Sequence, residues 1–374
     1  MSSRQERQET SKRRNESRSR WYTLKLVQHR LELTILSQGG TAVAVARCGA
    51  DVATRWFPVN PNLANLKGFR QTLIEQLRGN APLKRLTVAD AQKFGRDLFD
   101  FVISGDIDDL YKKLTHNDVI SWKVLTDSSD FDDIPWEFLQ EPKGVSPRRT
   151  RSVVRILQTV GMSPPDPLPR TSLTRVLLVA AEPVGLRNVG WQDIEQRLRR
   201  EYGAKSPLQL DVIEGTDRQS LLAALTAKQF DIVHFSCHGD ASGQGGRLVL
   251  MNRATGAPDY VSAQQIGQVL TGRNLRVVIL SACESSLPGA QPTTYSNVAQ
   301  TLIKMGIPVV VANQASIKVP SMATFVGALY RELLQSGNID IAMAEARLAL
   351  STELSVEWGV PTLHRLYGGS QVYQ

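Results

Sequence analysis

Two stretches decide the fold: FDIVHFSCHGD, residues 230–240, and RVVILSACESS, residues 276–286. Each is a short apolar run, rich in Val and Ile, that ends in a reactive side chain: His238 in the first and Cys283 in the second. Runs of this kind predict strands buried on both faces of a parallel sheet. The carboxyl ends of such strands meet at one edge, where neighbouring strands lie about 4.8 Å apart. The sequence therefore predicts that an imidazole and a thiol come together at that edge.

Residues 171–374 alternate between strand-like and helix-like segments. Apolar runs such as RVLLVAAEP (175–183), LQLDVIEG (208–215) and IPVVVAN (307–313) are separated by amphipathic stretches with helical spacing. This alternation predicts an α/β fold, with a mostly parallel sheet covered by helices on both faces. The proline-rich stretch GMSPPDPLPRTS (161–172) favours extended backbone, and we place a boundary near its end.

Residues 21–170 have a different pattern and predict an α+β half. Period-two alternation in LELTIL (31–36) and TAVAVARC (41–48) predicts strands joined by a hairpin turn at QGG. Helical spacing follows in LKGFRQTLIEQL (66–77) and ADAQKFGRDLFDFVI (89–103). We expect this half to support the second one.

The first twenty residues form a basic tail. Residues 2–20 carry seven Lys or Arg and three Glu, so their net charge of +4 is half of the formal net charge of +8. The tail has no apolar residue after Met1, so it cannot repay the entropy of ordering, and we expect it to be disordered. An electrostatic arm for nucleic acid or acidic lipid is the functional alternative, but no aromatic residue is interleaved for base stacking. We expect nucleic acid to bind only weakly, through this tail.

The composition excludes several classes of protein. No run approaches the roughly 18 apolar residues of a membrane-spanning helix, and the Met1 end is polar where a secretory signal is apolar. Cys48, Cys237 and Cys283 are too few for a disulfide framework and do not show zinc-ligand spacing. No phosphate-binding glycine motif opens a strand-to-helix turn. We expect a cytoplasmic protein without metal or cofactor and without direct membrane insertion.

The motifs HFSCHG (234–239) and LSACESS (280–286) resemble the His and Cys motifs of the CHAT domain family, caspase-like cysteine proteases related to separases. The resemblance extends in order over about residues 21–374. Further stretches that carry it are LELTILSQGG (31–40), FGRDLFDFVISG (94–105), IPWEFL (134–139), VLLVAAEP (176–183) and LHRLYGGS (363–370). It implies a caspase-like second half (171–374), preceded by a degenerate pseudo-protease half (21–170).

The resemblance also implies roles for site residues. His238 is expected to be the general base and Cys283 the nucleophile of a cysteine endopeptidase that cleaves a specific protein. A neighbouring imidazole lowers the pKa of a thiol, so that a thiolate is available to attack a peptide carbonyl. The backbone amides of Gly239 and Cys283 are expected to bind the resulting oxyanion.

Substrate-binding residues are harder to identify from the sequence. Some caspase relatives that cleave after Arg or Lys have an Asp two residues before the nucleophile, where this chain has Ser281, so a basic specificity pocket of that kind is missing. Ser281 itself is a polar candidate for substrate binding. Asp231, Asp240 and Glu284 are the acidic candidates for a pocket wall, although Asp231 also fits the start of a strand and Glu284 a loop cap.

Two further residues beside His238 have structural interpretations. Strand alternation turns Cys237 to the face opposite His238, which predicts that Cys237 packs in the core. His234 lies within the same strand, and we expect a buried imidazole that is hydrogen-bonded beneath the site.

The family resemblance suggests partners that the residues alone do not. It implies regulated proteolysis in bacterial antiviral defence, with an upstream activator and a gasdermin-like pore-forming effector as the protein substrate. Two alternatives remain open: a catalytically silent scaffold or signalling adaptor that binds a protein partner, and a nucleic-acid-associated factor that works through the basic tail.

Overall fold

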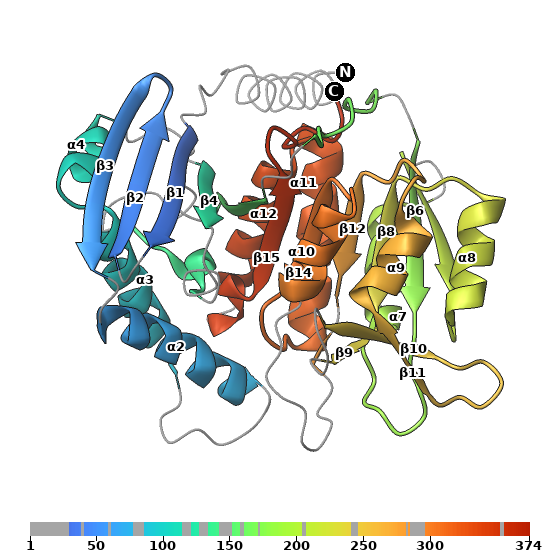
Figure 1. Ribbon diagram of the computed structural model, residues 1–374. Helices are drawn as coiled ribbons and strands as arrows, with labels where there is room; N and C mark the ends of the chain where they lie inside the picture. Colours follow the sequence, from blue (N-terminus) through green and yellow to red (C-terminus); the bar gives the residue numbers. More distant parts are fainter. Residues whose placement is uncertain are drawn as a thin grey trace, which may run out of the picture.

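The structure, a computed structural model, contains one large mixed sheet (Figure 1). Its eleven strands run in the order β3-β2-β1-β4-β5-β15-β14-β12-β8-β6-β7. Seven of the neighbouring pairs are parallel and three are antiparallel. The structure describes residues 30–38, 41–58, 61–77, 86–113, 121–126, 134–141, 152–157, 161–170, 173–203, 207–240, 246–281, 283–284, 296–351 and 355–374.

The strands of the large sheet come from both halves of the chain. The first half contributes β1 (Arg30–Gln38), β2 (Thr41–Cys48), β3 (Asp51–Pro58), β4 (Ser121–Thr126) and β5 (Ser152–Leu157). The second half contributes β6 (Thr174–Ala180), β7 (Leu208–Ile213), β8 (Ile232–Ser236), β12 (Val277–Leu280), β14 (Val309–Asn313) and β15 (Pro361–Leu366). The antiparallel strands β3, β2 and β1 form one end of the sheet, and parallel strands form most of the remainder.

Helices cover both faces of the sheet, as the apolar strands require. One core lies under α2 (Pro61–Leu77), α3 (Val88–Val102), α4 (Asp106–Lys112), α7 (Trp191–Glu201), α11 (Val319–Ser336) and α12 (Ile339–Ser351). The opposite core lies under α8 (Arg218–Ala227), α9 (Ala263–Leu270) and α10 (Ser296–Lys304). The predicted α/β class, with a mostly parallel sheet and helices on both faces, is confirmed. None of the described helices has the length and apolarity that a bilayer crossing needs.

The two halves are joined within the sheet. The C-terminal strand β15 pairs in parallel with β5 on one side and antiparallel with β14 on the other. In Figure 1 the red strand β15 lies between the strands of the first half and the orange strands β14 and β12. The boundary near residue 171 stays a prediction, and the tail at residues 1–20 lies outside the described residues.

A second, four-stranded sheet lies at the carboxyl end of the central strands. It consists of β9 (His238–Asp240), β10 (Arg247–Met251), β11 (Pro258–Ser262) and β13 (Cys283–Glu284), in the order β11-β10-β9-β13. β9 begins two residues after β8, and β13 begins three residues after β12. The small sheet is therefore an extension of the two strands that the sequence singled out.

Candidate active site

His238 and Cys283 are register partners in the small sheet. β9 and β13 pair in parallel, with Cys283 opposite His238 and Glu284 opposite Gly239. The preceding strands β8 and β12 are themselves parallel neighbours, so they deliver both residues to the same edge of the large sheet. The backbones of the two residues thus lie one strand apart, at about 4.8 Å. The side chains of Cys283 and Glu284 lie outside the described part of the structure.

His238 is buried, and its ring is held by a backbone carbonyl. The side chain is 2% exposed, and Nε2 lies 2.6 Å from the carbonyl oxygen of Arg187. Because a carbonyl oxygen only accepts hydrogen bonds, this contact requires Nε2 to carry a proton. The neutral ring is then the tautomer in which Nδ1 is the basic nitrogen.

The loop between β6 and α7 carries the Arg187 carbonyl and is itself braced. The Glu182 carboxylate accepts a hydrogen bond of 3.1 Å from the backbone N–H of Val189. Gly190 follows with φ of +70°, and a Cβ built there would lie 2.1 Å from Cγ1 of Val319 at the start of α11. Glycine is therefore required at this position by both its backbone conformation and its close packing. The loop thus contacts His238 through Arg187 on one side and Val319, at the start of α11, through Gly190 on the other.

A buried polar group lies beneath the site, on the face covered by α11. Nε2 of His234 lies 2.6 Å from Oγ of Ser281, and Nδ1 lies 3.3 Å from the Tyr330 hydroxyl. Complete burial lowers the pKa of His234 to about 3, so the imidazole is neutral. His234 is thus the buried, hydrogen-bonded histidine that the sequence predicted. Ser281 is only 1% exposed and packs beneath the site, and its role in substrate binding stays a prediction.

Asp240 is engaged by an arginine within the small sheet. Arg247 is its register partner on β10, and the Arg247 guanidinium forms an ion pair with the Asp240 carboxylate, with Nε 2.9 Å from Oδ2. Arg247 in turn lies over the ring of Tyr260, 4.8 Å from its centroid. Gly239 pairs with Leu248 on one side and Glu284 on the other. Its oxyanion role, like the substrate-binding role of Asp240, stays a prediction.

The structure does not bring Asp231 to the site. Asp231 immediately precedes β8, and its carboxylate accepts a hydrogen bond of 2.8 Å from the backbone N–H of Arg175. His238 lies seven residues further along the chain, past the other end of β8. At about 3.3 Å per residue this separates the two by roughly 20 Å. Asp231 joins two strands at the amino end of the sheet, and its predicted role in substrate binding gains no support.

Cys237 packs where strand alternation placed it. It is completely buried in the core under α8, α9 and α10, on the face opposite His234. The interpretation of Cys237 as a core residue is confirmed. Cys48 is partly exposed at the end of β2.

Sequence reasoning missed the Arg187 carbonyl. A backbone acceptor has no residue-type signature, because every residue carries a carbonyl. The loop that carries it, LRNVG (186–190), has the composition of an ordinary polar connection. No signal in the sequence pairs it with His238.

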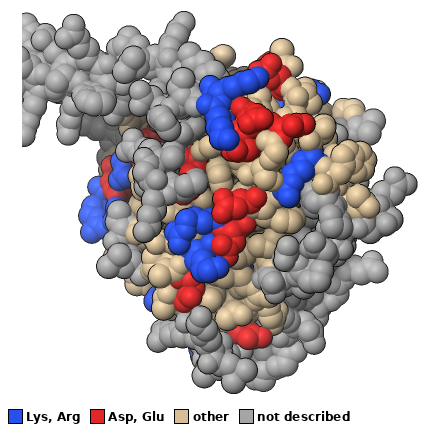
Figure 2. Space-filling view, turned by 90° about the vertical axis from the view of Figure 1, so that its left-hand side faces the viewer, with Lys and Arg blue, Asp and Glu red and all other residues tan. Residues whose placement is uncertain are grey.

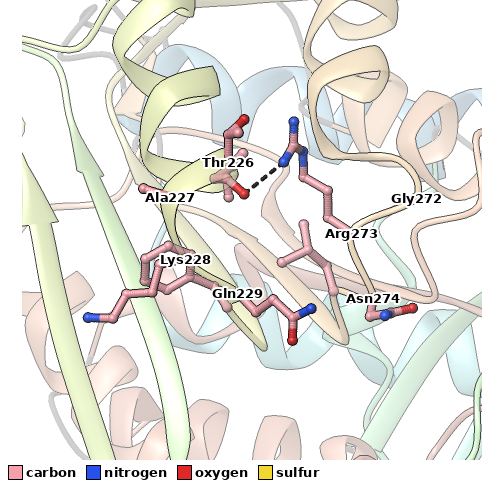
Figure 3. Close-up of a pocket in the computed structure, with 10 residues that line it drawn as sticks. Thr226, Ala227, Lys228, Gln229, Gly272, Arg273 and Asn274 are labelled. Atoms are coloured by element: carbon pink, nitrogen blue, oxygen red, sulfur yellow. Dashed lines mark hydrogen bonds between the residues drawn. The ribbon is translucent and has the colours of Figure 1, made fainter.

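A separate pocket lies at the opposite, amino end of β8 (Figure 3). It has a volume of about 280 Å³ and is lined by Lys228, Gln229, Arg273 and Asn274 among others. Arg273 donates hydrogen bonds to the carbonyls of Leu225 (2.7 Å) and Val269 (2.6 Å) near the carboxyl ends of α8 and α9. A cation at helix carboxyl ends stabilises them, so Arg273 has a structural role. Within the described ranges, no three His, Cys, Asp or Glu side chains come together as a metal site.

The end of the molecule formed by β3 and α4 carries interspersed charges. Figure 2 shows Lys and Arg side chains beside Asp and Glu on this face. Ion pairs join Lys112 to Asp108 at 2.6 Å and Lys113 to Asp51 at 3.5 Å. The described part of this face is therefore not the continuous basic surface that binds phosphate backbones.

Comparison with known proteins assigns the chain to a family. Chains in two crystal structures of the Saccharomyces cerevisiae separase-securin complex are similar in structure, with TM-scores of 0.49 and 0.44 and identities of 12% and 13%. Each match covers 91% of this chain and 30% of the other, so this chain spans less than a third of their length. No curated protein matches the chain. The model of the CHAT domain matches residues 92–358, which is most of the sequence, and the chain belongs to the CHAT domain family.

Proposed function

We propose that the protein is a cysteine endopeptidase in which Cys283 is the nucleophile and His238 the general base. The observation that carries this proposal is the pairing of Cys283 with His238 across β13 and β9. Family membership and the orientation of the imidazole support it. With Nε2 bound to the Arg187 carbonyl, Nδ1 is the nitrogen available to take a proton.

The reaction proceeds through an acyl-enzyme. Nδ1 of His238 takes the Cys283 thiol proton, and the thiolate sulfur bonds to the carbonyl carbon of the scissile peptide. Collapse of the tetrahedral intermediate breaks the carbon–nitrogen bond, and the imidazolium gives its proton to the departing amine. Water then attacks the thioester, with His238 taking its proton, and releases a carboxylate and the free thiol. The amides of Gly239 and Cys283 are the candidate oxyanion donors.

The substrate is a specific protein, and a gasdermin-like pore-forming effector is the candidate that the family suggests. The Asp240–Arg247 ion pair lies in the same small sheet as His238, so it belongs to the surroundings of a substrate bound there. We place regulation by an upstream activator in the same proposal.

Identification of new protein N-termini by mass spectrometry tests the proposal. Lysate of the source cell is incubated with the wild-type protein, Cys283→Ala, His238→Ala or Cys48→Ala. New N-termini are expected with wild type and Cys48→Ala and not with the other two variants. The cleaved sequences then define the site preference and show whether a gasdermin-like protein is among the substrates.

A second measurement separates a latent enzyme from a silent scaffold. Iodoacetamide labelling compares Cys283 with the partly exposed Cys48 in the same molecule. An activated Cys283 is alkylated at about pH 6, well below the ordinary thiol pKa of about 8.5. Identical N-termini in all four reactions, together with a Cys283 that reacts only at alkaline pH, would leave the scaffold as the function.

A further inference from the structure

Three buried polar residues link the first half of the chain to the catalytic edge of the sheet. Glu137 lies in the short helix η1 (Trp136–Phe138), Arg155 in β5, and Gln314 directly after β14. Their exposed fractions are 0%, 7% and 1%. We call these residues the seam cluster. Buried charges are costly unless they are paired, so a cluster of this kind at a junction requires explanation.

The Glu137 carboxylate accepts hydrogen bonds from both other members. Arg155 donates from Nε to Oε1 and from Nη2 to Oε2, both at 2.8 Å. Gln314 donates from Nε2 to Oε2 at 3.0 Å, and the same amide also donates to the Gly359 carbonyl at 2.7 Å. Burial raises the pKa of Glu137, but the charges of Arg155 and Arg347 outweigh it and hold the pKa below its ordinary value. Glu137 is therefore a carboxylate that fixes the position of Gln314.

Gln314 and the nucleophile segment both follow the carboxyl ends of neighbouring strands. β14 pairs in parallel with β12, and Val311 is opposite Ile279. Gln314 directly follows the carboxyl end of β14, and β13 begins with Cys283 three residues after the carboxyl end of β12. The hydrogen bonds of Gln314 thus fix the chain at the edge where the site is built.

From Gln314 the packing continues to His238. The segment after Gln314 enters α11 at Val319, and the Glu357 carboxylate accepts a hydrogen bond of 2.8 Å from the backbone N–H of Lys318 there. Val319 packs against Gly190 with no room for a Cβ, and the loop that ends at Gly190 carries the Arg187 carbonyl 2.6 Å from His238. Contiguous contacts thus run from Glu137 to the imidazole.

We infer that Glu137 is a positioning residue for the site, through which the first half of the chain sets the geometry of His238 and Cys283. The inference rests on the proposed function and adds a route by which an event in the first half alters catalysis. Misplacement of catalytic groups by about 1 Å reduces reaction rates by about a hundredfold. A displacement of the Gln314 segment that moves His238 or Cys283 is therefore expected to change the reactivity of the site measurably.

The chain offers a matched control for this inference. Asp340 and Arg365 form another buried bidentate pair, with both contacts at 2.9 Å. Arg365 pairs with Val309, at the amino end of β14, roughly 16 Å from Gln314 by strand geometry. Asp340→Asn and Glu137→Gln each remove one buried negative charge from an arginine, but the Glu137 carboxylate also accepts the Gln314 amide, whereas Asp340 holds Arg365, opposite Ile156 on β5.

The test is the pH profile of Cys283 alkylation by iodoacetamide in the full chain, with thermal unfolding measured in parallel. Both variants are expected to lose stability, because each leaves a buried guanidinium without its carboxylate. Glu137→Gln is expected to move the alkylation profile towards that of an ordinary thiol, lowering the rate near pH 6 about tenfold, which corresponds to about one pKa unit. Asp340→Asn is expected to leave the profile within about twofold of wild type.

A second variant covers the case in which Glu137→Gln does not fold. Gln314→Met keeps a similar volume and the Glu137–Arg155 pair but removes the amide, and the same shift is expected. Unchanged profiles in these variants, or an equal shift in Asp340→Asn, overturn the inference while the protease proposal stands. A wild-type Cys283 that already titrates as an ordinary thiol overturns the proposed function and the inference with it.

Discussion

At the scale of single residues, the contacts and protonation of the buried polar side chains are what the sequence pattern predicted least. His234 and His364 lie in central strands, and burial lowers the pKa of each to about 3. His364 lies 3.2 Å from the Thr362 hydroxyl, beside the charges of Arg155, Glu137 and Arg347. Both rings are neutral near pH 7, and each has at least one polar contact in the core.

These two imidazoles predict a specific pH dependence of stability. Their folded pKa of about 3 lies below the ordinary value of 6.5, so between these values the unfolded chain binds more protons than the folded one. The free energy of unfolding is therefore expected to fall as the pH is lowered from about 6.5 towards 3, by up to about 1.4 kcal/mol per pH unit for each ring. Urea unfolding at several pH values measures the slope.

His364→Gln is the variant for this measurement. It removes one of the two contributions, so its unfolding free energy should depend less steeply on pH than that of wild type, whatever its stability at pH 7. A slope equal to that of wild type would show that His364 is protonated in the folded state.

At the residue scale the sequence predicted the site only in part. Strand alternation correctly predicted that Cys237, which directly follows β8, packs in the core, because the side-chain period of a strand is fixed at two. The burial of Ser281 and the distance of Asp231 from His238 depend on tertiary packing and strand direction, which a list of acidic and polar candidates does not contain.

At the scale of elements, two strands that the sequence did not identify, β5 and β15, join the halves. β5 (SVVRIL) and β15 (PTLHRL) contain arginines that are buried and paired, Arg155 with Glu137 and Arg365 with Asp340. Charged residues are seldom buried without a partner, so an arginine in a short apolar run indicates a solvent-facing position and argues against a buried strand. The partners come from distant segments, so the pattern alone could not reveal these strands.

The contact between α3 and η1 is an element-scale feature with a direct test. A Cβ built at Gly95 would lie 2.1 Å from the Phe138 carbonyl oxygen and 2.9 Å from Cβ of Gln140. Gly95→Ala is therefore expected to destabilise the protein by about 1–3 kcal/mol through overpacking, although alanine is the better helix former. Thermal or urea unfolding measures the change.

Gly68→Ala is the matched control for Gly95→Ala. Gly68 also lies within a helix, α2, but a Cβ there has no neighbour within 4 Å. This substitution is expected to be neutral or to stabilise the protein by up to about 1 kcal/mol. A Gly95→Ala variant as stable as Gly68→Ala would mean that η1 moves away from α3 at little cost.

At the scale of the whole molecule, the continuous sheet conflicts with independent folding of two halves divided near residue 171. β15 is the last strand of the second half in the sequence, but in the sheet it lies between β5 and β14. Without β5, one side of β15 has no strand partner, and the Arg347 guanidinium loses its hydrogen bond of 3.0 Å to the Val153 carbonyl. Each buried polar group that loses its hydrogen-bond partner lowers the free energy of unfolding by about 1–3 kcal/mol, which is a large fraction of the stability of an ordinary protein.

Expression of residues 171–374 without the first half tests this view. The fragment is expected to aggregate or to unfold without a cooperative transition, because an exposed apolar strand edge invites pairing with other chains. Co-expression with residues 1–170 should restore a soluble complex whose Cys283 alkylation profile resembles that of the full chain. The thermal unfolding of the fragment, alone and in the complex, is the measurement. Cooperative unfolding of the isolated fragment would establish two independent domains, and the first half would then act on the site as a separable regulator and not as part of its framework.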